Sequence, residues 1–426
     1  MSNLHKASIE EIKQVQWLQL KKQLAYLQLN SPFYTELLDH RNVNVQNIQS
    51  YEDFKKLPIT TKEDLQQSND RFYAVPRHEV IDYVTTSGTL GSPVSMGLND
   101  ADLERLTTNE FGSFKLAGVE KEDIVQITTT LDRRFMAGLA YFLGLRKLGA
   151  GIIRTGSGLP QLQWDSIERF KAKYLVAVPS FLLKMLLYAK ENNIDFKNTS
   201  VKAAICIGEP IRGVDYSLNA LGSRISELWD IELFSTYAST EMATAFTECE
   251  VHKGNHIQPE LIFTEILDLE GNPVQPGEIG ELVVTPLQSQ TMPLLRFATG
   301  DMLTYTNAPC ACGRNTERLS SVVGRKKQMI KLKGTSIYPQ NVIEILTNFE
   351  GIETFVIEAR RGELGTDLLT VKVADSFPLD RVKVLIEHFK SRLQVTPDLQ
   401  LVKKEEIEIL RIPEGSRKPQ YFRDYR

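Results

Sequence analysis

The segment YLVAVPSFLLKMLLYAKENNIDFKNTSVKAAICI, residues 174–207, reads as a strand, a helix and a second strand. The pattern of apolar residues predicts these three elements at 174–178, 180–191 and 202–207. The alternation continues on both sides, with a strand at 152–153 and helices near 161–171 and 214–221. Strands that alternate with helices predict an α/β fold, in which helices cover both faces of a mainly parallel sheet.

The regions that flank this alternating core have other patterns. A helix is expected at 8–29, where Ser8 and Glu11 have the spacing of a capping box. From 261 to 284 two β-rich runs are joined by turn residues, which predicts a small subdomain of antiparallel strands. Beyond Gly324-Arg325 short strands and helices form a separate α+β pattern. We therefore expect a large domain at 1–324 and a small domain at 325–426.

Composition excludes several classes of protein. The chain has 426 residues, more than one hydrophobic core normally serves, and its net charge of −4 argues against nucleic acid as a partner. Residues 1–29 lack the apolar core of a signal peptide, and the longest apolar run, 136–145, is too short to span a bilayer. Four cysteines do not make a disulfide framework at this length, so we expect a cytoplasmic protein without a membrane partner.

The stretch VTTSGTLGSPV, residues 84–94, begins as a strand and continues as hydroxyl and glycine residues, with a helical run at 103–116 behind it. Hydroxyls can donate hydrogen bonds to a phosphate, and glycines let backbone N–H groups approach an anion. The same composition also suits a surface turn, so the stretch alone leaves both interpretations open. The chain lacks the motif G-x-x-x-x-G-K-[ST] and has no G-x-G-x-x-G in a βαβ unit. A P-loop protein and a dinucleotide-binding protein are therefore less well supported.

Five further polar clusters occur along the chain. They are Gly208-Glu209-Pro210, Tyr237-Ala238-Ser239-Thr240-Glu241, Arg296-Phe297-Ala298-Thr299-Gly300-Asp301, Gly324-Arg325 and Gly415-Ser416-Arg417-Lys418. Each alone could be a capped turn, a solvated ion pair or a frayed terminus. The cluster at 208–210 follows a buried strand, which is where ligands bind in α/β sheets. The cluster at 296–301 ends in an acid that could accept hydrogen bonds from paired hydroxyls.

Taken in this order, the motifs resemble those of the adenylate-forming superfamily of acyl-CoA ligases, luciferases and adenylation domains. The family's T-S-G-T-T-G-x-P, Y-G-x-T-E, R-x-x-T-G-D and G-R-x-D/K…I-K-x-x-G match residues 86–93, 237–241, 296–301 and 324–334. Within the superfamily the chain looks like the phenylacetate–CoA ligase branch, which is marked by residues 31–34, 57–62, 208–210 and 310–314. The resemblance spans nearly the whole chain.

The resemblance implies that ATP activates a carboxylic acid as its acyl-adenylate and that the acyl group then passes to a thiol, most readily that of coenzyme A. It implies a phosphate contact for Thr240, Mg²⁺ for Glu241, and the carboxylate and α-phosphate for Lys418. Lys327 would be the hinge of a mobile C-terminal lid. The ATP- or AMP-binding residues implied are Thr86, Ser87, Gly88, Thr89, Gly91, Gly208, Glu209, Pro210, Tyr237, Ala238, Ser239, Asp301 and Arg325.

The segment 133–149 is expected to be an apolar helix that ends at a glycine, and its start corresponds to a family segment that lines the acyl pocket. By resemblance Phe135, Ala137 and Ala238 would line this pocket. An aromatic side chain there suits an aryl or arylacetic acid, although Phe135 could equally belong to the core.

Several residues depart from the family pattern. Leu90 and Ser92 replace a hydroxyl residue and a lysine in the phosphate loop, and Arg417 replaces the glycine before Lys418. These departures leave two alternatives open. One is a stand-alone adenylation enzyme that loads the phosphopantetheine of an acyl carrier protein, and the other is a non-catalytic nucleotide-binding protein on the same fold. The resemblance to the phenylacetate–CoA ligase branch also suggests that the protein forms a homodimer.

Three of the four cysteines lie in two short patches with histidines nearby. They are Cys249, Cys310 and Cys312, with His252 and His256. A Cys₃His set satisfies tetrahedral Zn²⁺ and leaves no position open for substrate, so such a site would be structural. Some members of the branch carry this site, and His256 fits their pattern better than His252. Free thiols are the alternative, and Cys206, in an apolar strand, is expected in the core.

Overall fold

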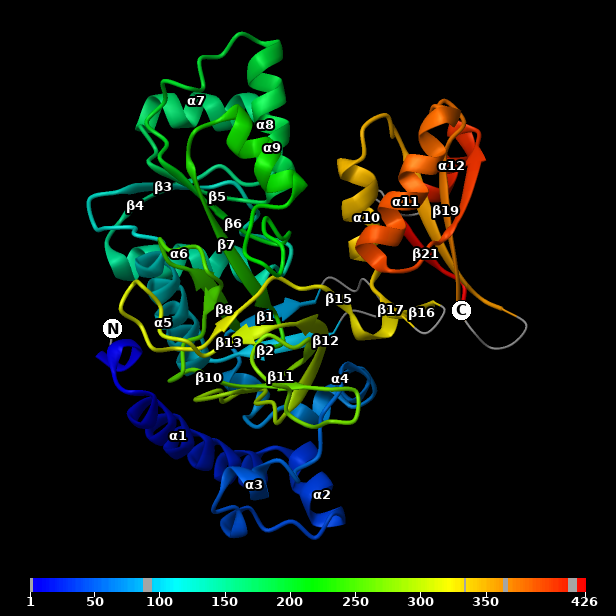
Figure 1. The fold of residues 1–426 in the computed structure, drawn as a ribbon. Coiled ribbons are helices and arrows are strands. Elements are labelled where there is room, and N and C mark those ends of the chain that lie inside the picture. The colour runs from blue at the N-terminus through cyan, green and yellow to red at the C-terminus, as the bar shows by residue number, and fades with distance from the viewer. Residues whose placement is uncertain (1–2, 87–93, 333–334, 363–366, 413–419) are drawn as a thin grey trace. The chain divides into compact units, whose positions relative to one another are not determined.

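The computed structural model describes residues 3–86, 94–332, 335–362, 367–412 and 420–426 (Figure 1). The chain forms two compact units. The first comprises Met1–Thr299 and Leu303–Ser321, and the second comprises Gly300–Met302 and Val322–Arg426.

Among its described residues, the first unit contains a nine-stranded sheet in the order β13-β14-β9-β8-β7-β6-β5-β3-β4. The strands from β4 to β7 are parallel, and those from β7 to β13 are antiparallel. The long strand β7 therefore belongs to both halves of the sheet. The strands are β3 (Ile124–Ile127), β4 (Gly151–Arg154), β5 (Tyr174–Ala177), β6 (Ala203–Cys206), β7 (Glu232–Ser239), β8 (Thr244–Glu248), β9 (Asn255–His256), β13 (Tyr305–Thr306) and β14 (Arg318–Leu319).

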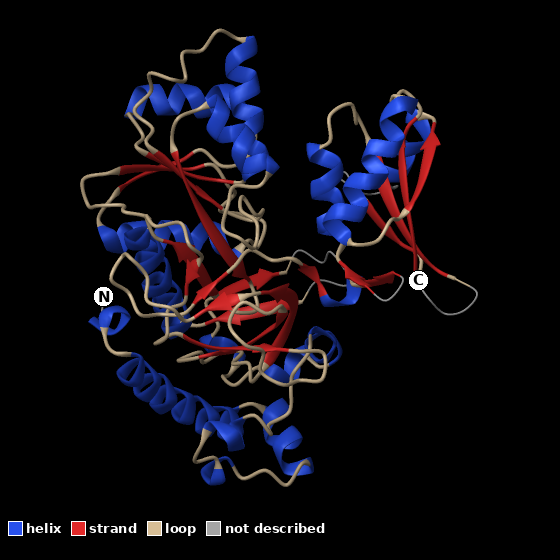
Figure 2. Ribbon diagram, in the orientation of Figure 1, coloured by secondary structure: helices blue, strands red, loops and turns tan. Residues whose placement is uncertain are grey.

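Helices cover both faces of the parallel half, as Figure 2 shows. Leu175 and Ala204 pack against helices α7, α8 and α9, whereas their neighbours Val176 and Ile205 point to the other face and pack against α5 and α6. This alternation follows from the period of two along a strand. The helices are α5 (Asp100–Leu116), α6 (Met136–Leu148), α7 (Pro160–Phe170), α8 (Pro179–Glu191) and α9 (Ala220–Leu228).

The remainder of the first unit begins with the helix expected at 8–29. Ser8 and Glu11 form the capping box, with a Glu11 N to Ser8 Oγ distance of 3.2 Å. The antiparallel pair expected from residue 261 is β10 (Ile262–Leu267) with β11 (Gly280–Pro286). The other elements are η1 (Asn3–Lys6), α1 (Ile9–Asn30), α2 (Pro32–His40), η2 (Val45–Asn47), α3 (Tyr51–Phe54), α4 (Lys62–Gln67), η3 (Asn69–Phe72), η4 (Arg77–Glu79), and the pair β1 (Asp82–Thr85) and β2 (Ser95–Leu98).

Two helix predictions were wrong in their limits. The helix expected at 214–221 is instead a turn, closed by a hydrogen bond from Gly213 N to Ser217 O and by the Asp215 carboxylate; α9 begins only after its cap, Asn219. The helix expected from residue 133 begins at Met136, because Arg133 and Arg134 have left-handed φ angles of 58° and 60°. Its predicted end is confirmed by Gly149, whose φ of 84° favours glycine.

In the second unit a four-stranded sheet has the order β20-β19-β18-β21, and α10 and α11 supply apolar side chains to its core. Strand β12 (Phe297–Leu303) enters this unit, where Asp301 and Met302 pair with β15 (Gly324–Arg325). The other elements are η5 (Lys326–Gln328), β16 (Ile330–Leu332), β17 (Thr335–Ile337), α10 (Pro339–Asn348), β18 (Phe355–Arg361), β19 (Asp367–Ala374), η6 (Leu379–Arg381), α11 (Val382–Leu393), β20 (Asp398–Val402), α12 (Lys404–Arg411) and β21 (Phe422–Asp424).

The predicted α/β fold class is confirmed by this architecture. The domain limits 1–324 and 325–426 stay a prediction. Within the described ranges, every helix is too short or too polar to cross a lipid bilayer.

Helix α5 buries an unusual set of polar side chains. Asp102, Arg105 and Asn109 lie on one face at helical spacing, and each is at most 6% exposed. Glu110 is also buried, where α5 crosses α6 so closely that a Cβ added at Gly144 would lie 2.5 Å from Glu110 Cβ. Burial raises the pKa of the Glu110 carboxyl to about 8.

Candidate active site and metal centre

The loop after β6 lies at the carboxyl edge of the parallel strands, where ligands bind in α/β sheets. The Glu209 carboxylate accepts hydrogen bonds from Ser180 N and Ser180 Oγ, both at 2.9 Å, and so caps the start of α8. Asn219 Nδ2 donates to Pro210 O at 2.8 Å. These contacts fix, from both sides, the backbone of Gly208-Glu209-Pro210, the loop predicted to bind ATP or AMP.

The second predicted cluster continues β7 into a turn. Tyr237 pairs with Phe246 across β7 and β8, and the two rings stack with centroids 6.0 Å apart. Ser239 Oγ accepts a hydrogen bond from Met242 N at 3.3 Å, and Thr240 O accepts one from Ala243 N at 3.2 Å. Thr240 and Glu241 are therefore held in a hydrogen-bonded turn.

Glu241 is buried and faces a lysine that the sequence analysis did not assign to the site. Lys62 Nζ donates to Glu241 Oε1 at 3.0 Å. Lys62 is the first residue of α4, which is capped by Thr61, and Thr60 Oγ1 donates to Leu295 O at 2.7 Å. The sequence signal that could have assigned Lys62 to the site is its position at the end of the branch motif 57–62. A cation and a carboxylate thus meet in the turn that contains Thr240.

The predicted phosphate loop is closed at its ends. Thr86 is buried, Thr86 N donates to Val94 O, and Val94 N donates to Thr86 Oγ1, both at 3.0 Å. Thr85 N donates to Arg134 O at 3.1 Å, so the start of the loop contacts the segment before α6. The loop residues Ser87, Gly88, Thr89, Leu90, Gly91 and Ser92 lie outside the described residues, as do Arg417 and Lys418.

The predicted acyl-pocket residues come from two elements. Phe135 directly precedes α6 and is 38% exposed, and Ala137 is half-buried as the second residue of that helix. Ala238 is exposed on β7, between Tyr237 and Ser239. Because Thr85 contacts Arg134, the start of α6 lies beside the predicted phosphate loop. That these three residues form a pocket stays a prediction.

In the second unit, Asp301 and Arg325 lie opposite each other on β12 and β15. Arg325 Nε is 2.9 Å from Asp301 Oδ1, with Asp301 buried and Arg325 about half exposed. These two predicted ATP- or AMP-binding residues therefore lie together. Lys327, the predicted hinge, is exposed in η5 immediately after β15.

The cysteine patches meet in the first unit. The sulfur atoms of Cys249, Cys310 and Cys312 and a ring nitrogen of His256 all lie within 4.8 Å of one another. Cys249 Sγ is 3.8 Å from Cys310 Sγ, and Cys312 Sγ is 3.6 Å from His256 Nε2. Two segments far apart in the sequence, 249–256 and 310–312, supply the four groups.

These separations fit tetrahedral zinc. With Zn–S bonds of ~2.3 Å and a Zn–N bond of ~2.05 Å, a regular tetrahedron has sulfur atoms about 3.8 Å apart and sulfur and nitrogen about 3.6 Å apart. Both observed distances agree with these values. The donor set of three thiols and one imidazole is also one that zinc prefers.

The environment of His256 suits a ligand. Its Nδ1 lies 2.7 Å from Thr316 Oγ1, which leaves Nε2 for the cysteine cluster. Burial, together with the nearby charges of Arg314 and Arg318, lowers the pKa of His256 to about 3, so the ring is neutral. His252, the alternative ligand, points instead to Glu248, with Nδ1 3.2 Å from Glu248 Oε2. Cys206 is buried in β6, where burial raises its thiol pKa.

Comparison with known proteins identifies the family. The sequence profile described as AMP-binding enzyme matches residues 32–292, more than half of the chain. The chain belongs to the AMP-binding enzyme family. It is an adenylate-forming ligase, as the motifs predicted, and it is similar to phenylacetate–CoA ligases.

The sequence similarity extends over most of the chain. This chain is 28% identical to the phenylacetate–coenzyme A ligase of Thermus thermophilus, over 86% of this chain and 83% of that protein. It is 29% identical to the corresponding ligase of Aromatoleum evansii, over 87% and 83% of the two chains. A solved structure of 2-hydroxyisobutyryl-CoA ligase with R3-HIB-AMP shares the fold, with a TM-score of 0.82, 22% identity, and coverage of 100% of this chain and 92% of that one.

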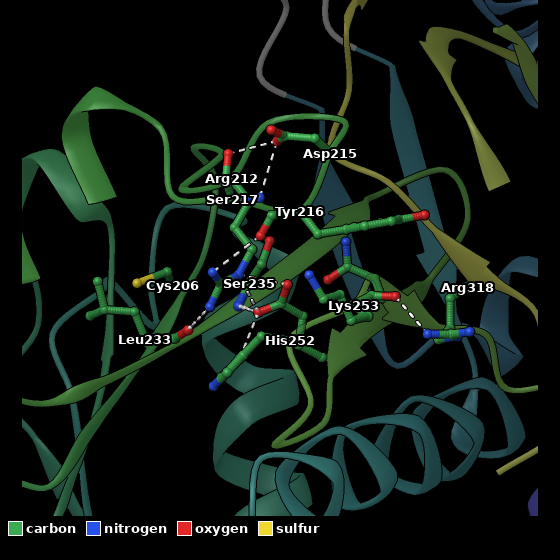
Figure 3. Close-up of polar contacts among 12 residues, drawn as sticks. Cys206, Arg212, Asp215, Tyr216, Ser217, Leu233, Ser235, His252, Lys253 and Arg318 are labelled. Carbon is green, nitrogen blue, oxygen red and sulfur yellow. Dashed lines mark hydrogen bonds and ion pairs between the residues drawn. The ribbon is translucent and has the colours of Figure 1, made fainter. Parts of the chain in front are cut away.

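In this ligase Arg212, Ser235 and His252 lie close together (Figure 3). The buried carboxylate of Glu248, one residue before Cys249, accepts hydrogen bonds from Arg212 Nε at 3.0 Å and Ser235 N at 2.9 Å. Arg212 follows the loop 208–210 and also donates to Leu233 O at 3.0 Å. Glu248 therefore connects the segment after this loop with the strand that carries Tyr237.

Proposed function

We propose that this ligase uses ATP and Mg²⁺ to convert an aryl or arylacetic acid into its acyl-adenylate and then transfers the acyl group to the thiol of coenzyme A. The observation that carries the proposal is the similarity to phenylacetate–CoA ligases along most of the chain. The acid itself is inferred from that similarity and from the aromatic side chain of Phe135 at the start of α6.

In the first step a carboxylate oxygen attacks the α-phosphorus of ATP, and the bond from that phosphorus to the leaving pyrophosphate breaks. Charge gathers on the phosphates, so positioning and electrostatic stabilisation matter more than a protein nucleophile. Bound Mg²⁺ supplies a hard cation that neutralises this charge, and an oxygen ligand such as the Glu241 carboxylate suits it. Lys62, at 3.0 Å, compensates the buried Glu241 charge and keeps its carboxylate in place.

Other residues orient the nucleotide. The Thr240 hydroxyl and the phosphate-loop residues Thr86 to Gly91 would donate to phosphate oxygens. Tyr237 would stack near the adenine, with Gly208-Glu209-Pro210 lining the opposite side, supported by the contacts of Glu209 with Ser180. Asp301, paired with Arg325, would accept from the ribose hydroxyls.

In the second step the thiol attacks the acyl carbon, and AMP leaves. We infer that Lys418 serves only the first step, and that the small domain then turns about Lys327. A structural Zn²⁺ would bind to the cluster formed by Cys249, His256, Cys310 and Cys312 and would join the two segments that supply these residues.

Replacing Lys418 with alanine is expected to slow adenylation by about 10²–10³-fold, the usual cost of removing one preorganised donor to developing charge. Thioester formation from a supplied acyl-adenylate and coenzyme A should fall far less. Pyrophosphate release and acyl-CoA formation, measured separately, distinguish the two steps. Lys404→Ala, which removes an exposed lysine of the same unit, is the matched control.

An equal loss in both steps would contradict the assignment of Lys418 to adenylation. Adenylate that forms and is trapped by hydroxylamine without any transfer to free coenzyme A would instead favour a carrier-protein phosphopantetheine as the acceptor.

A further inference from the structure

Arg105, on the buried face of α5, makes four hydrogen bonds to segments far away in the sequence. Its Nε donates to Leu287 O at 2.6 Å, and one terminal nitrogen donates to Ala243 O at 2.6 Å. The other terminal nitrogen donates to Thr244 Oγ1 at 2.9 Å and to Leu261 O at 2.5 Å. The guanidinium thus joins one helix to three separate segments.

All four acceptors of Arg105 are neutral. The acid on the same buried face of α5 is Asp102, whose oxygens accept from Gln290 N at 2.8 Å and Thr291 N at 2.9 Å. Burial lowers the pKa of Arg105 to about 10, so the side chain still carries its charge at neutral pH. A buried cation without a paired carboxylate is costly, and it persists only where its hydrogen bonds are satisfied. Such a group calls for an explanation beyond packing.

Two of the four acceptors belong to the turn that carries Glu241. Ala243 has a left-handed φ of 46°, which a residue with a side chain adopts only when its surroundings hold it there. Arg105 holds the Ala243 carbonyl directly. It also contacts Thr244 Oγ1, which donates onward to Met242 O at 3.0 Å. Both carbonyl groups that directly follow Glu241 are therefore fixed by one side chain.

We propose that Arg105 is a positioning residue that holds the turn at residues 240–244 in the conformation in which Glu241 binds the Mg²⁺ of ATP. Arg105 acts through the backbone and does not itself touch substrate. The inference rests on the proposed role of Glu241. It goes beyond that role by assigning the geometry of the metal ligand to a side chain 136 positions earlier in the sequence.

The test measures how much Mg²⁺ improves ATP binding, by calorimetry without any carboxylic acid so that no reaction occurs. In the wild type, ATP should bind more tightly with Mg²⁺ than in EDTA. Arg105→Lys keeps the charge but cannot reach all four acceptors, and it should reduce the gain from Mg²⁺ on the order of tenfold, as a misplaced ligand does. ATP affinity in EDTA should fall less than the affinity with Mg²⁺, since only the Thr240 hydroxyl of this turn would contact ATP without the metal.

Three further variants separate the explanations. Glu241→Gln removes the proposed ligand and should lose the same gain. Thr244→Val removes only the link to Met242 O and should show a smaller loss in the same direction, which keeps the proposal testable if Arg105→Lys does not fold. Phe114→Leu alters a buried side chain further along α5 and should lower Tm without affecting the gain.

The proposal is overturned if Glu241→Gln loses the gain from Mg²⁺ while Arg105→Lys and Thr244→Val keep it and only melt earlier, as Phe114→Leu does. If Glu241→Gln itself keeps the gain, the proposed role of Glu241 is wrong, and the inference about Arg105 fails with it. The two failures are distinguished by the Glu241→Gln measurement alone.

Discussion

Replacing Cys310 with alanine is expected to release about one zinc ion per chain and to lower the Tm of the first unit by about 10 °C. Structural zinc sites contribute ~10–16 kcal/mol in isolated zinc-finger peptides. In a large unit whose core persists without the metal, a loss of about 4 kcal/mol is enough for a Tm shift of this size. Metal analysis of chelator-free protein and a thermal melt measure the two effects.

The chain provides matched controls for the metal site. Cys206→Ala changes the cysteine outside the cluster and should keep the zinc. His256→Ala should lose it, whereas His252→Ala should keep it, because His252 contacts Glu248 rather than the cysteine sulfurs. A wild-type preparation that contains no zinc and is nevertheless folded and active would contradict the proposed site.

Replacing Glu110 with glutamine is expected to remove most of a strong pH dependence of stability. Burial raises the pKa of Glu110 from 4.5 in an unfolded chain to about 8. Below pH 4.5 the carboxyl is protonated in both states. Between pH 4.5 and 8 the unfolded state loses its proton while the folded state keeps it, so the free energy of unfolding falls as pH rises. The fall amounts to about 3–5 kcal/mol.

The measurement is urea unfolding at several pH values, followed by tryptophan fluorescence. All three tryptophans, Trp17, Trp164 and Trp229, belong to the first unit, which also contains Glu110. The stability of Glu110→Gln relative to the wild type should rise between pH 5 and pH 8. Glu104→Gln, which alters an exposed glutamate on the same helix, should leave the wild-type slope unchanged. Parallel pH profiles for the wild type and Glu110→Gln would show that Glu110 is ionised in the folded state.

Local sequence patterns predicted most of the fold. The signals are the capping box at Ser8, the apolar strands at 174–178 and 202–207, and the glycine at 149. Each acts through neighbouring residues, and all three kinds of signal are confirmed. The helix expected at 214–221 was wrong because Asp215 closes a turn there and Asn219 provides a better helix start. Competition between two local hydrogen-bonding patterns decided that case.

The candidate site was less accessible to sequence reasoning, because its contacts join distant segments. Lys62 and Glu241 lie 179 positions apart, and nothing local to either residue indicates the other. Arg105 was also missed, although Asp102, Arg105 and Asn109 form a polar stripe at helical spacing in a helix that packs against the sheet. Each of these side chains forms a hydrogen bond with the backbone of another segment. Their helical spacing is the sequence signal that could have indicated a buried polar face. The cysteine cluster was found because its ligand types are distinctive.

The most direct test of the account is ATP–pyrophosphate exchange with a panel of aryl, arylacetic, fatty and amino acids. Exchange requires only the first step, so it does not depend on whether coenzyme A or a carrier protein accepts the acyl group. The account predicts exchange that requires Mg²⁺ and is fastest with an aromatic acid. Bound ATP without exchange for any acid in the panel would contradict it, and would indicate a nucleotide-binding protein that keeps the fold without the chemistry.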